Sequence, residues 1–137
     1  MIIKEFISQT NKNQMIATLL KYYKVESVKV KQKSMKDHAH YNVDTGTLEL
    51  STKYKIIKRN QVKDFLITII HEIRHAMDAK KYGWRKFKDM YEWEMNYQIS
   101  QDKDEYKDNK YEIKAEKFGQ KNWQKWYKIF KKDNLIL

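Results

Sequence analysis

The residues best suited to chemistry in this sequence stand together in the segment HEIRH, which contains His71, Glu72 and His75. Residues four apart on an α-helix lie on the same face, so these two imidazoles can point at a single ion. A carboxylate beside the first of them can take a proton from a water held by that ion. The spacing therefore predicts a metal site with its own base, provided that the segment is helical.

The residues around this segment favour a helix from Gln61 to Tyr82. Apolar side chains recur every three or four positions and fall within one arc of the helix: Phe65, Leu66, Ile69, Ile70, Ile73 and Met77. The two histidines fall roughly opposite the centre of that arc. Asn60 suits the N-cap, and Gly83 suits the residue that ends the helix. We therefore expect one face of this helix in the core and the other in a cleft.

A catalytic zinc site needs a third protein ligand and an open fourth position. The sequence has no cysteine, and no histidine follows His75. A downstream ligand must therefore be a carboxylate. The candidates are Asp78, Glu92, Glu94, Glu105, Glu112 and Glu116.

We favour Glu112, which lies in the segment YEIKAEKFG (residues 111–119) on a predicted helix. Glu112 and Glu116 are four apart and share one helical face. Ala115 and Gly119 are small and also four apart, so they would let this helix approach the metal helix closely. The pattern predicts Glu112 on the metal and Glu116 accepting the other ring N–H of a ligand histidine.

Glu92 and Glu94 remain the rivals for the third position, with Asn96 four residues after Glu92. Asp78 lies two turns after His71 and suits either a supporting role behind the ligands or a surface charge.

The pair of motifs HEIRH and EIKAEKFG resembles the gluzincin metallopeptidases, and most of all their compact bacterial and phage relatives. The second motif of these relatives is Glu-x-x-Ala, then Asp, Asn or Glu, then an aromatic residue. The resemblance extends loosely over residues 10–120, and only the two motifs carry it specifically. Two features depart from the pattern: Glu116 stands where Asp or Asn is more usual, and the interval from His75 to Glu112 is long.

The resemblance implies that Zn²⁺ is bound by His71, His75 and Glu112, with Glu72 as the general base and Glu116 as the acid behind a ligand. It also implies an edge strand that lies across the cleft and pairs with an extended substrate. The segment 47–51 is the candidate for that strand. A residue that stabilises the oxyanion is expected too, but ten tyrosines offer too many choices to name one.

The remaining elements form an α+β pattern. Helices are predicted over residues 10–24, with Thr10 or Asn11 as the cap, and over 84–100 and about 109–132, with a polar loop at 101–110. Residues 25–32 alternate valine with charge, and residues 38–51 have the pattern of a hairpin turning at 44–47.

We therefore expect residues 1–137 to form one zincin-like domain. Its expected order is an N-terminal helix, a small sheet of about three strands, the HExxH helix, and C-terminal helices that carry the third ligand. His38 and His40, which would share a strand face, are expected to be surface histidines rather than a second metal site.

The chain carries a net charge of +11, which favours an anionic partner. Only Arg59, Arg74 and Arg85 among its 29 basic residues are arginine, the residue that reads bases and clamps phosphates. The excess of lysine also has an explanation unrelated to function, because codon usage in an AT-rich genome enriches Lys, Asn, Ile and Tyr together. The aromatic stretch 122–130 is expected to pack Trp123, Trp126, Tyr127 and Phe130 as one stripe on the core, although stacking on single-stranded nucleic acid and seating on a membrane surface are alternatives.

These features predict a zinc metallopeptidase that acts on a peptide or protein. Two other classes remain open: a basic protein associated with nucleic acid, either a DNA-bound protease or a pure binder, and a regulatory protein that keeps the zincin fold. No apolar segment is long enough to span a bilayer, and the N-terminus lacks the apolar core of a secretory signal, so we expect a cytoplasmic protein. The substrate and the oligomeric state do not follow from the sequence.

Overall fold

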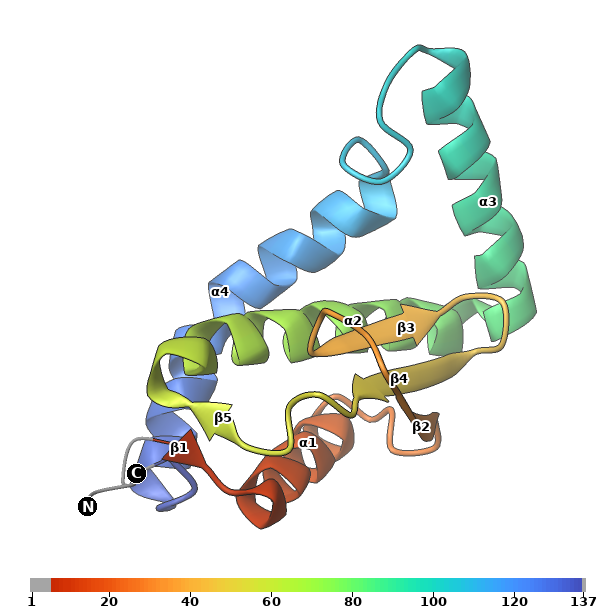
Figure 1. Ribbon diagram of the computed structural model, residues 1–137. Helices are drawn as coiled ribbons and strands as arrows, with labels where there is room; N and C mark the ends of the chain where they lie inside the picture. Colours follow the sequence, from red (N-terminus) through yellow and green to blue (C-terminus); the bar gives the residue numbers. More distant parts are fainter. Residues whose placement is uncertain (1–5, 137) are drawn as a thin grey trace.

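The computed structural model describes residues 6–136, and over these residues it is an α+β structure with four α-helices and a small three-stranded mixed sheet (Figure 1). The helices are α1 (Gln9–Tyr22), α2 (Val62–Tyr82), α3 (Trp84–Ser100) and α4 (Lys110–Lys132). The sheet contains β2 (Lys29–Lys33), β3 (Ala39–Asn42) and β4 (Thr47–Ser51). Two short strands, β1 (Phe6–Ile7) and β5 (Ile57–Lys58), pair separately, and a 3-10 turn, η1 (Arg59–Gln61), leads into α2.

The predicted helices are all present, and their ends differ from the prediction by two residues at most. α1 begins early because Ser8 caps it, in place of the predicted Thr10 or Asn11: its Oγ accepts the N–H of Asn11 at 3.1 Å. Asn60 does not cap α2, since it lies within η1. Gly83 does end α2, with a φ of +85° that suits glycine. Within residues 6–136, no helix is both long and apolar enough to cross a membrane.

The sheet has the order β2-β4-β3, so β4 is its central strand. β3 and β4 form the predicted antiparallel hairpin, and β2 joins β4 in parallel on the other side. The prediction that the segment 47–51 is a free edge strand is therefore wrong, because both edges of β4 are paired. β3 is the edge strand beside α2 (Figure 1). The alternation within each strand carries no information on this order, which depends on long-range pairing.

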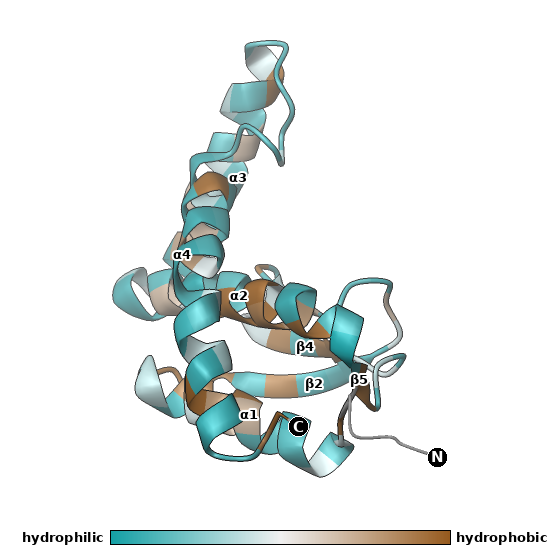
Figure 2. Cartoon of the chain, turned by 90° about the vertical axis from the view of Figure 1, so that its left-hand side faces the viewer, coloured by the Kyte–Doolittle hydropathy of each residue, from teal (hydrophilic) through white to brown (hydrophobic). Residues whose placement is uncertain are grey.

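α2 is the central element of the core. Its apolar residues Phe65, Leu66, Ile69, Ile70 and Ile73 are all buried, as expected, and pack with side chains of α1 and the sheet. Figure 2 shows apolar residues gathered on α2 and on the central strand β4, whereas α3 and α4 are largely hydrophilic on their outer sides. The opposite side of α2 is crossed by α4, so this helix is buried on both faces.

The crossing of α2 and α4 is close because α4 presents small residues there. Ala115 is fully buried, and a Cβ on Gly119 would lie 2.7 Å from the backbone oxygen of Ile67. No real side chain tolerates that distance without movement of the backbone. The prediction that these two small residues bring the helices together is thus confirmed.

We expect Gly119→Ala to destabilise the protein by about 1–3 kcal/mol, the usual cost of overpacking a well-packed interface. At an exposed helical position the same change would stabilise by about 1 kcal/mol, so the sign of the effect is diagnostic. Denaturant unfolding monitored by circular dichroism measures it. Lys121→Ala, at an exposed site on the same helix, is the control. Higher stability of Gly119→Ala would contradict the close crossing.

Candidate metal centre

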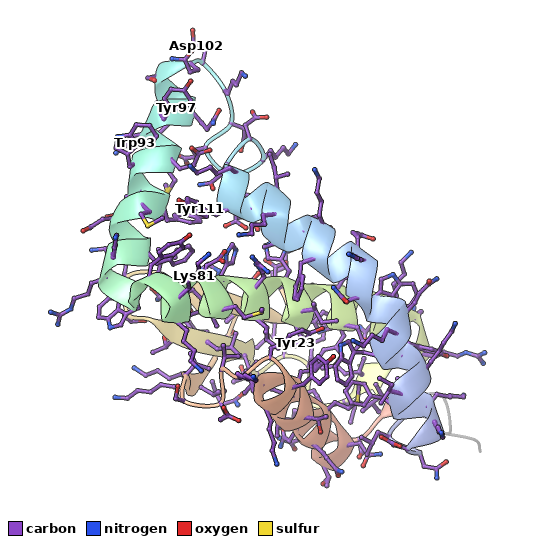
Figure 3. All side chains as sticks on the ribbon, turned by 180° about the vertical axis from the view of Figure 1, so that it is seen from behind. Tyr23, Lys81, Trp93, Tyr97, Asp102 and Tyr111 are labelled. Atoms are coloured by element: carbon purple, nitrogen blue, oxygen red, sulfur yellow. The ribbon has the colours of Figure 1, made fainter. Side chains whose placement is uncertain are left out.

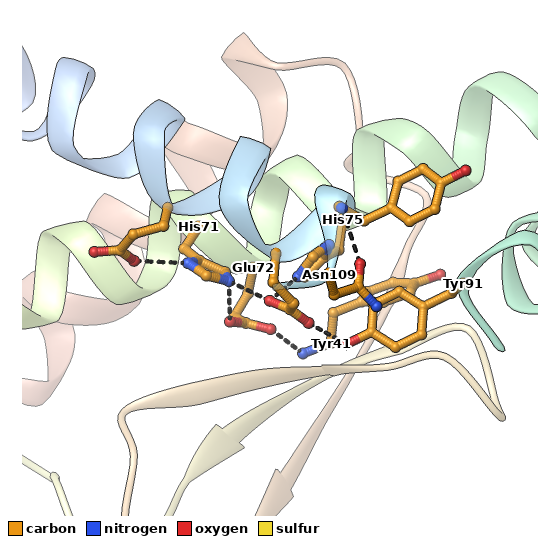
Figure 4. Close-up of polar contacts among 9 residues, drawn as sticks. Tyr41, His71, Glu72, His75, Tyr91 and Asn109 are labelled. Atoms are coloured by element: carbon orange, nitrogen blue, oxygen red, sulfur yellow. Dashed lines mark hydrogen bonds and ion pairs between the residues drawn. The ribbon is translucent and has the colours of Figure 1, made fainter. Parts of the chain in front are cut away.

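The two histidines of the HExxH segment lie one turn apart on α2 and are buried, with exposed fractions of 6% for His71 and 2% for His75. Their ring centroids are 5.1 Å apart. Both rings direct Nε2 at the same carboxylate oxygen, Oε1 of Glu112 on α4, at 2.8 Å from His71 and 2.9 Å from His75 (Figure 4). The structure thus brings the predicted third residue to the predicted pair.

One ligand atom from each of these three residues lies within 4.8 Å of the other two. All three side chains are buried, and among residues 6–136 they form the group of His and carboxylates able to hold a metal ion. Two imidazole nitrogens and one carboxylate oxygen are typical ligands of a transition metal.

The hydrogen-bond geometry of this site sets the protonation state that it needs when no ion is bound. Glu112 Oε1 accepts from both Nε2 atoms only if each ring is protonated there. Nδ1 of His71 lies 2.9 Å from Oε1 of Glu116, which as a carboxylate also only accepts. Without an ion, His71 must therefore carry two protons. A metal ion in place of the Nε2 protons leaves both imidazoles neutral and leaves His71 with an Nδ1–H that donates to Glu116.

The same contacts shift the pKa values of the cluster. Burial disfavours a charged His71, but the hydrogen bonds with Glu112 and Glu116 and the charge of Glu72 outweigh it and raise the pKa of His71 to about 9. Burial likewise opposes the ionised form of Glu112, yet the hydrogen bonds with His71 and His75 hold the pKa of Glu112 far below its usual value. The site thus keeps a buried anionic carboxylate whose charge is balanced by a proton on His71 or by a bound cation.

Glu72 faces the same point from α2 without joining the three ligand atoms. Its Oε1 accepts the backbone N–H of Tyr41 at 2.7 Å, and its Oε2 lies 3.6 Å from Nε2 of His71 (Figure 4). Burial raises the pKa of Glu72. The edge strand β3 therefore holds one oxygen of this carboxylate and leaves the other beside the metal-binding nitrogens.

The two histidines are oriented in different ways. Glu116 fixes the ring of His71 through Nδ1, and Gln120 in turn donates to Oε2 of Glu116 at 2.9 Å. Nδ1 of His75 has no hydrogen-bond partner among the described residues. Its ring lies instead among aromatic rings, with centroid distances of 6.1 to 6.4 Å to Tyr41, Phe87 and Tyr91. Packing against aromatic rings thus orients the ring of His75, whereas a hydrogen bond at Nδ1 orients the ring of His71.

α3 supplies two supports for Glu112 that the sequence did not reveal. The hydroxyl of Tyr91, which is 8% exposed, donates to Oε2 of Glu112. Glu94 accepts the N–H of Lys110 at 2.8 Å, and Asn109 accepts the N–H of Tyr111 at 2.9 Å, so two side chains cap the first turn of α4. The signal was present in the spacing of Phe87, Tyr91, Glu94 and Gln98, the buried residues of α3, which follow a helical period.

The other candidates for the third position lie elsewhere. Glu92 and Glu105 are exposed. Glu94 is buried but caps α4, as described above. Asp78 is 2% exposed and lies 3.5 Å from both Arg74 and Lys114 in a separate ionic cluster. None of these four residues belongs to the metal-binding group.

The upstream histidines do not contribute to the centre. His40 is exposed, as predicted, whereas His38 is half-buried with its ring 4.0 Å from that of Tyr54. Neither belongs to a group able to hold a metal ion among the described residues.

A pocket of about 400 Å³ opens beside the centre, lined by His71, Glu112, Glu116, Ile113, Tyr106, Lys107 and Lys117. Tyr106, which lies in the loop between α3 and α4, is 52% exposed and reaches this pocket from the solvent side. Burial and the charges of Glu112 and Glu72 raise its pKa. The pocket therefore reaches two members of the candidate group, His71 and Glu112, from the outside.

We expect Tyr91→Phe to lower the metal affinity by about 10–100-fold, the usual loss when a group that orients a ligand is removed. The substitution keeps the ring and deletes only the hydroxyl that donates to Glu112. Competition with a chromogenic chelator measures the affinity. Tyr111→Phe is the control, because its ring packs beside that of Tyr91 in the angle between α3 and α4 (Figure 3) but donates no hydrogen bond to Glu112. Equal affinities of the two variants would contradict the role of Tyr91.

Known proteins provide no template for this centre, since no family model, no curated protein and no solved structure matches the chain. Its chemistry follows from the residues that the fold brings together.

Proposed function

We propose that this chain is a zinc-dependent metallopeptidase in which His71, His75 and Glu112 hold the ion and Glu72 is the general base. One observation carries the proposal: three buried donor atoms from α2 and α4 converge on a point that the carboxylate of Glu72 also faces. The order of elements, with a helix, a small sheet, the metal helix and the glutamate helix, is the order expected of a compact zincin-like protein.

The choice of zinc rests on the donor set. Two imidazole nitrogens and one carboxylate oxygen leave the fourth tetrahedral position open, as in catalytic rather than structural zinc sites. The three donor atoms lie within 4.8 Å of one another, so His71, His75 and Glu112 would hold one zinc ion together.

When bound, the ion supplies Lewis acidity to the scissile carbonyl and to the attacking water. Glu72 takes the proton of that water and carries it to the leaving amine. The N–H of Tyr41 occupies Oε1 of Glu72, so Oε2 is the atom that receives the proton. Glu116 holds Nδ1–H of His71 and thereby directs the lone pair of Nε2 inward.

An extended peptide fits beside β3 as the substrate. In an antiparallel pair, alternate residues direct their backbone groups towards the partner strand and away from it. Tyr41 donates its N–H to Glu72, away from β4, so the backbone groups of Ala39 also face the centre. A peptide that adds to this edge would run past the metal and past Glu72.

We expect Glu72→Gln to keep its zinc and to lose peptide hydrolysis by about 10²–10⁴-fold, because the amide preserves the shape of the side chain but takes up no proton. Zinc content by atomic emission and cleavage of an unstructured protein such as casein measure the two properties. Glu92→Gln, at an exposed site, should match the unmodified chain. Full hydrolysis by Glu72→Gln would exclude Glu72 as the base.

We expect Glu112→Gln to weaken zinc binding by at least about 10-fold, since an amide is a poorer ligand and the charge that balances the ion is lost. Calorimetric titration with zinc measures this affinity. Glu94→Gln is the matched control, because its amide oxygen still accepts the N–H of Lys110. Loss of zinc in Glu94→Gln with retention in Glu112→Gln would contradict the proposed ligand set.

A further inference from the structure

A second hollow of about 410 Å³ lies between the first turn of α2 and the C-terminal half of α4. It is lined by Arg59, Val62, Lys63, Trp123, Gln124, Tyr127 and Lys128, which we call the basic aromatic pocket. No residue of the metal centre lines it. In Figure 1 this region, at the start of α2, lies on the side of the molecule away from α3.

Two aromatic side chains of this pocket depart from the expected pattern. The sequence predicts one core stripe of four aromatic residues, but only Trp126 and Phe130 are buried, with exposed fractions of 3% and 0%. Trp123 and Tyr127 are half-buried and line the pocket. Their ring centroids are 6.2 Å apart and their planes are inclined by 75°. The stretch 122–130 therefore serves two surfaces, one in the core and one facing solvent.

The charged residues that line this pocket, within the described part of the chain, are all basic. Nζ of Lys63 lies 5.2 Å from the ring centroid of Trp123, and Lys128 lines the same pocket. The N-terminal end of α2 adds a partial positive charge at this point. The pocket thus combines two aromatic side chains with the ammonium groups of Lys63 and Lys128.

We propose that the basic aromatic pocket binds single-stranded nucleic acid, with bases stacked on Trp123 and Tyr127 and phosphates paired with Lys63 and Lys128. Stacking platforms beside cations are the common physical basis of single-strand binding without sequence preference. A duplex keeps its base faces covered and offers only phosphates. An acidic peptide would use the cations and leave the rings without a partner.

The net charge of +11 supports this assignment, because a basic surface raises the rate at which a polyanion is captured. The metal centre plays no part in the binding.

The test uses a fluorescein-labelled oligo(dT) of about a dozen nucleotides, within the site sizes of single-strand binders, and fluorescence anisotropy. We expect binding that is unchanged by a zinc chelator and at least about ten-fold tighter than binding to a duplex of the same length. Two neutralised phosphates predict that log K falls with log salt with a slope of about −1.4. Equal affinity for the duplex would overturn the proposal.

Charge-matched variants locate the binding site. Lys63→Glu with Lys128→Glu should lower the affinity at least about ten-fold, since two phosphate contacts become repulsive. Lys31→Glu with Lys86→Glu makes the same change in net charge at exposed positions on β2 and α3 and should have a much smaller effect. Equal losses in the two double variants would show attraction to the whole surface and overturn the proposal.

The aromatic contribution is tested separately. Tyr127→Phe keeps the ring and should bind like the unmodified chain, whereas Tyr127→Leu should bind about five-fold or more weakly, in line with the loss of one stacked base. Thermal melting confirms that both variants are folded. Equal binding by the two variants, or equal competition by polyglutamate and by unlabelled oligo(dT), would also overturn the proposal.

Discussion

The contact between α4 and α2 is the interaction on which the candidate centre depends. HExxH spacing places two imidazoles on one side of a helix, but a third ligand has to come from elsewhere in the chain. The candidate here is Glu112, whose Oε1 lies 2.8 and 2.9 Å from the two Nε2 atoms. Gly119, two turns further along α4, lets the helices approach until their backbones are almost in contact. A larger residue there would push α4, and Glu112 with it, away from the histidines.

α3 holds the first turn of α4 in place against α2 through side-chain hydrogen bonds. It carries few buried residues, and two of them, Tyr91 and Glu94, form hydrogen bonds with α4. Tyr91 donates to the free oxygen of Glu112, and Glu94 accepts the N–H of Lys110 at the start of the helix. Buried polar groups of this kind are costly unless they are paired. Their pairing here fixes both the position and the rotation of the segment that brings Glu112 to α2.

Features of the site that depend on local periodicity could be predicted from the sequence. His71 with His75, Glu112 with Glu116, and Ala115 with Gly119 are each four residues apart, and helical geometry alone puts each pair on one face. Features that depend on long-range packing could not. β4 became the central strand because β2 pairs with it in parallel, and no pattern within either strand encodes that partner. Likewise, two of the ten tyrosines, Tyr91 and Tyr106, approach Glu112, and the paths of α3 and of the loop after it decide which two.

The central claim is that one metal ion bridges α2 and α4. Crystals of the zinc-loaded protein, measured on both sides of the zinc absorption edge, test it most directly. The account predicts an anomalous peak within about 2.0–2.2 Å of Nε2 of His71, Nε2 of His75 and an oxygen of Glu112. The absence of a peak between these residues, or a peak bound by Glu92 or Glu94 in place of Glu112, would contradict it.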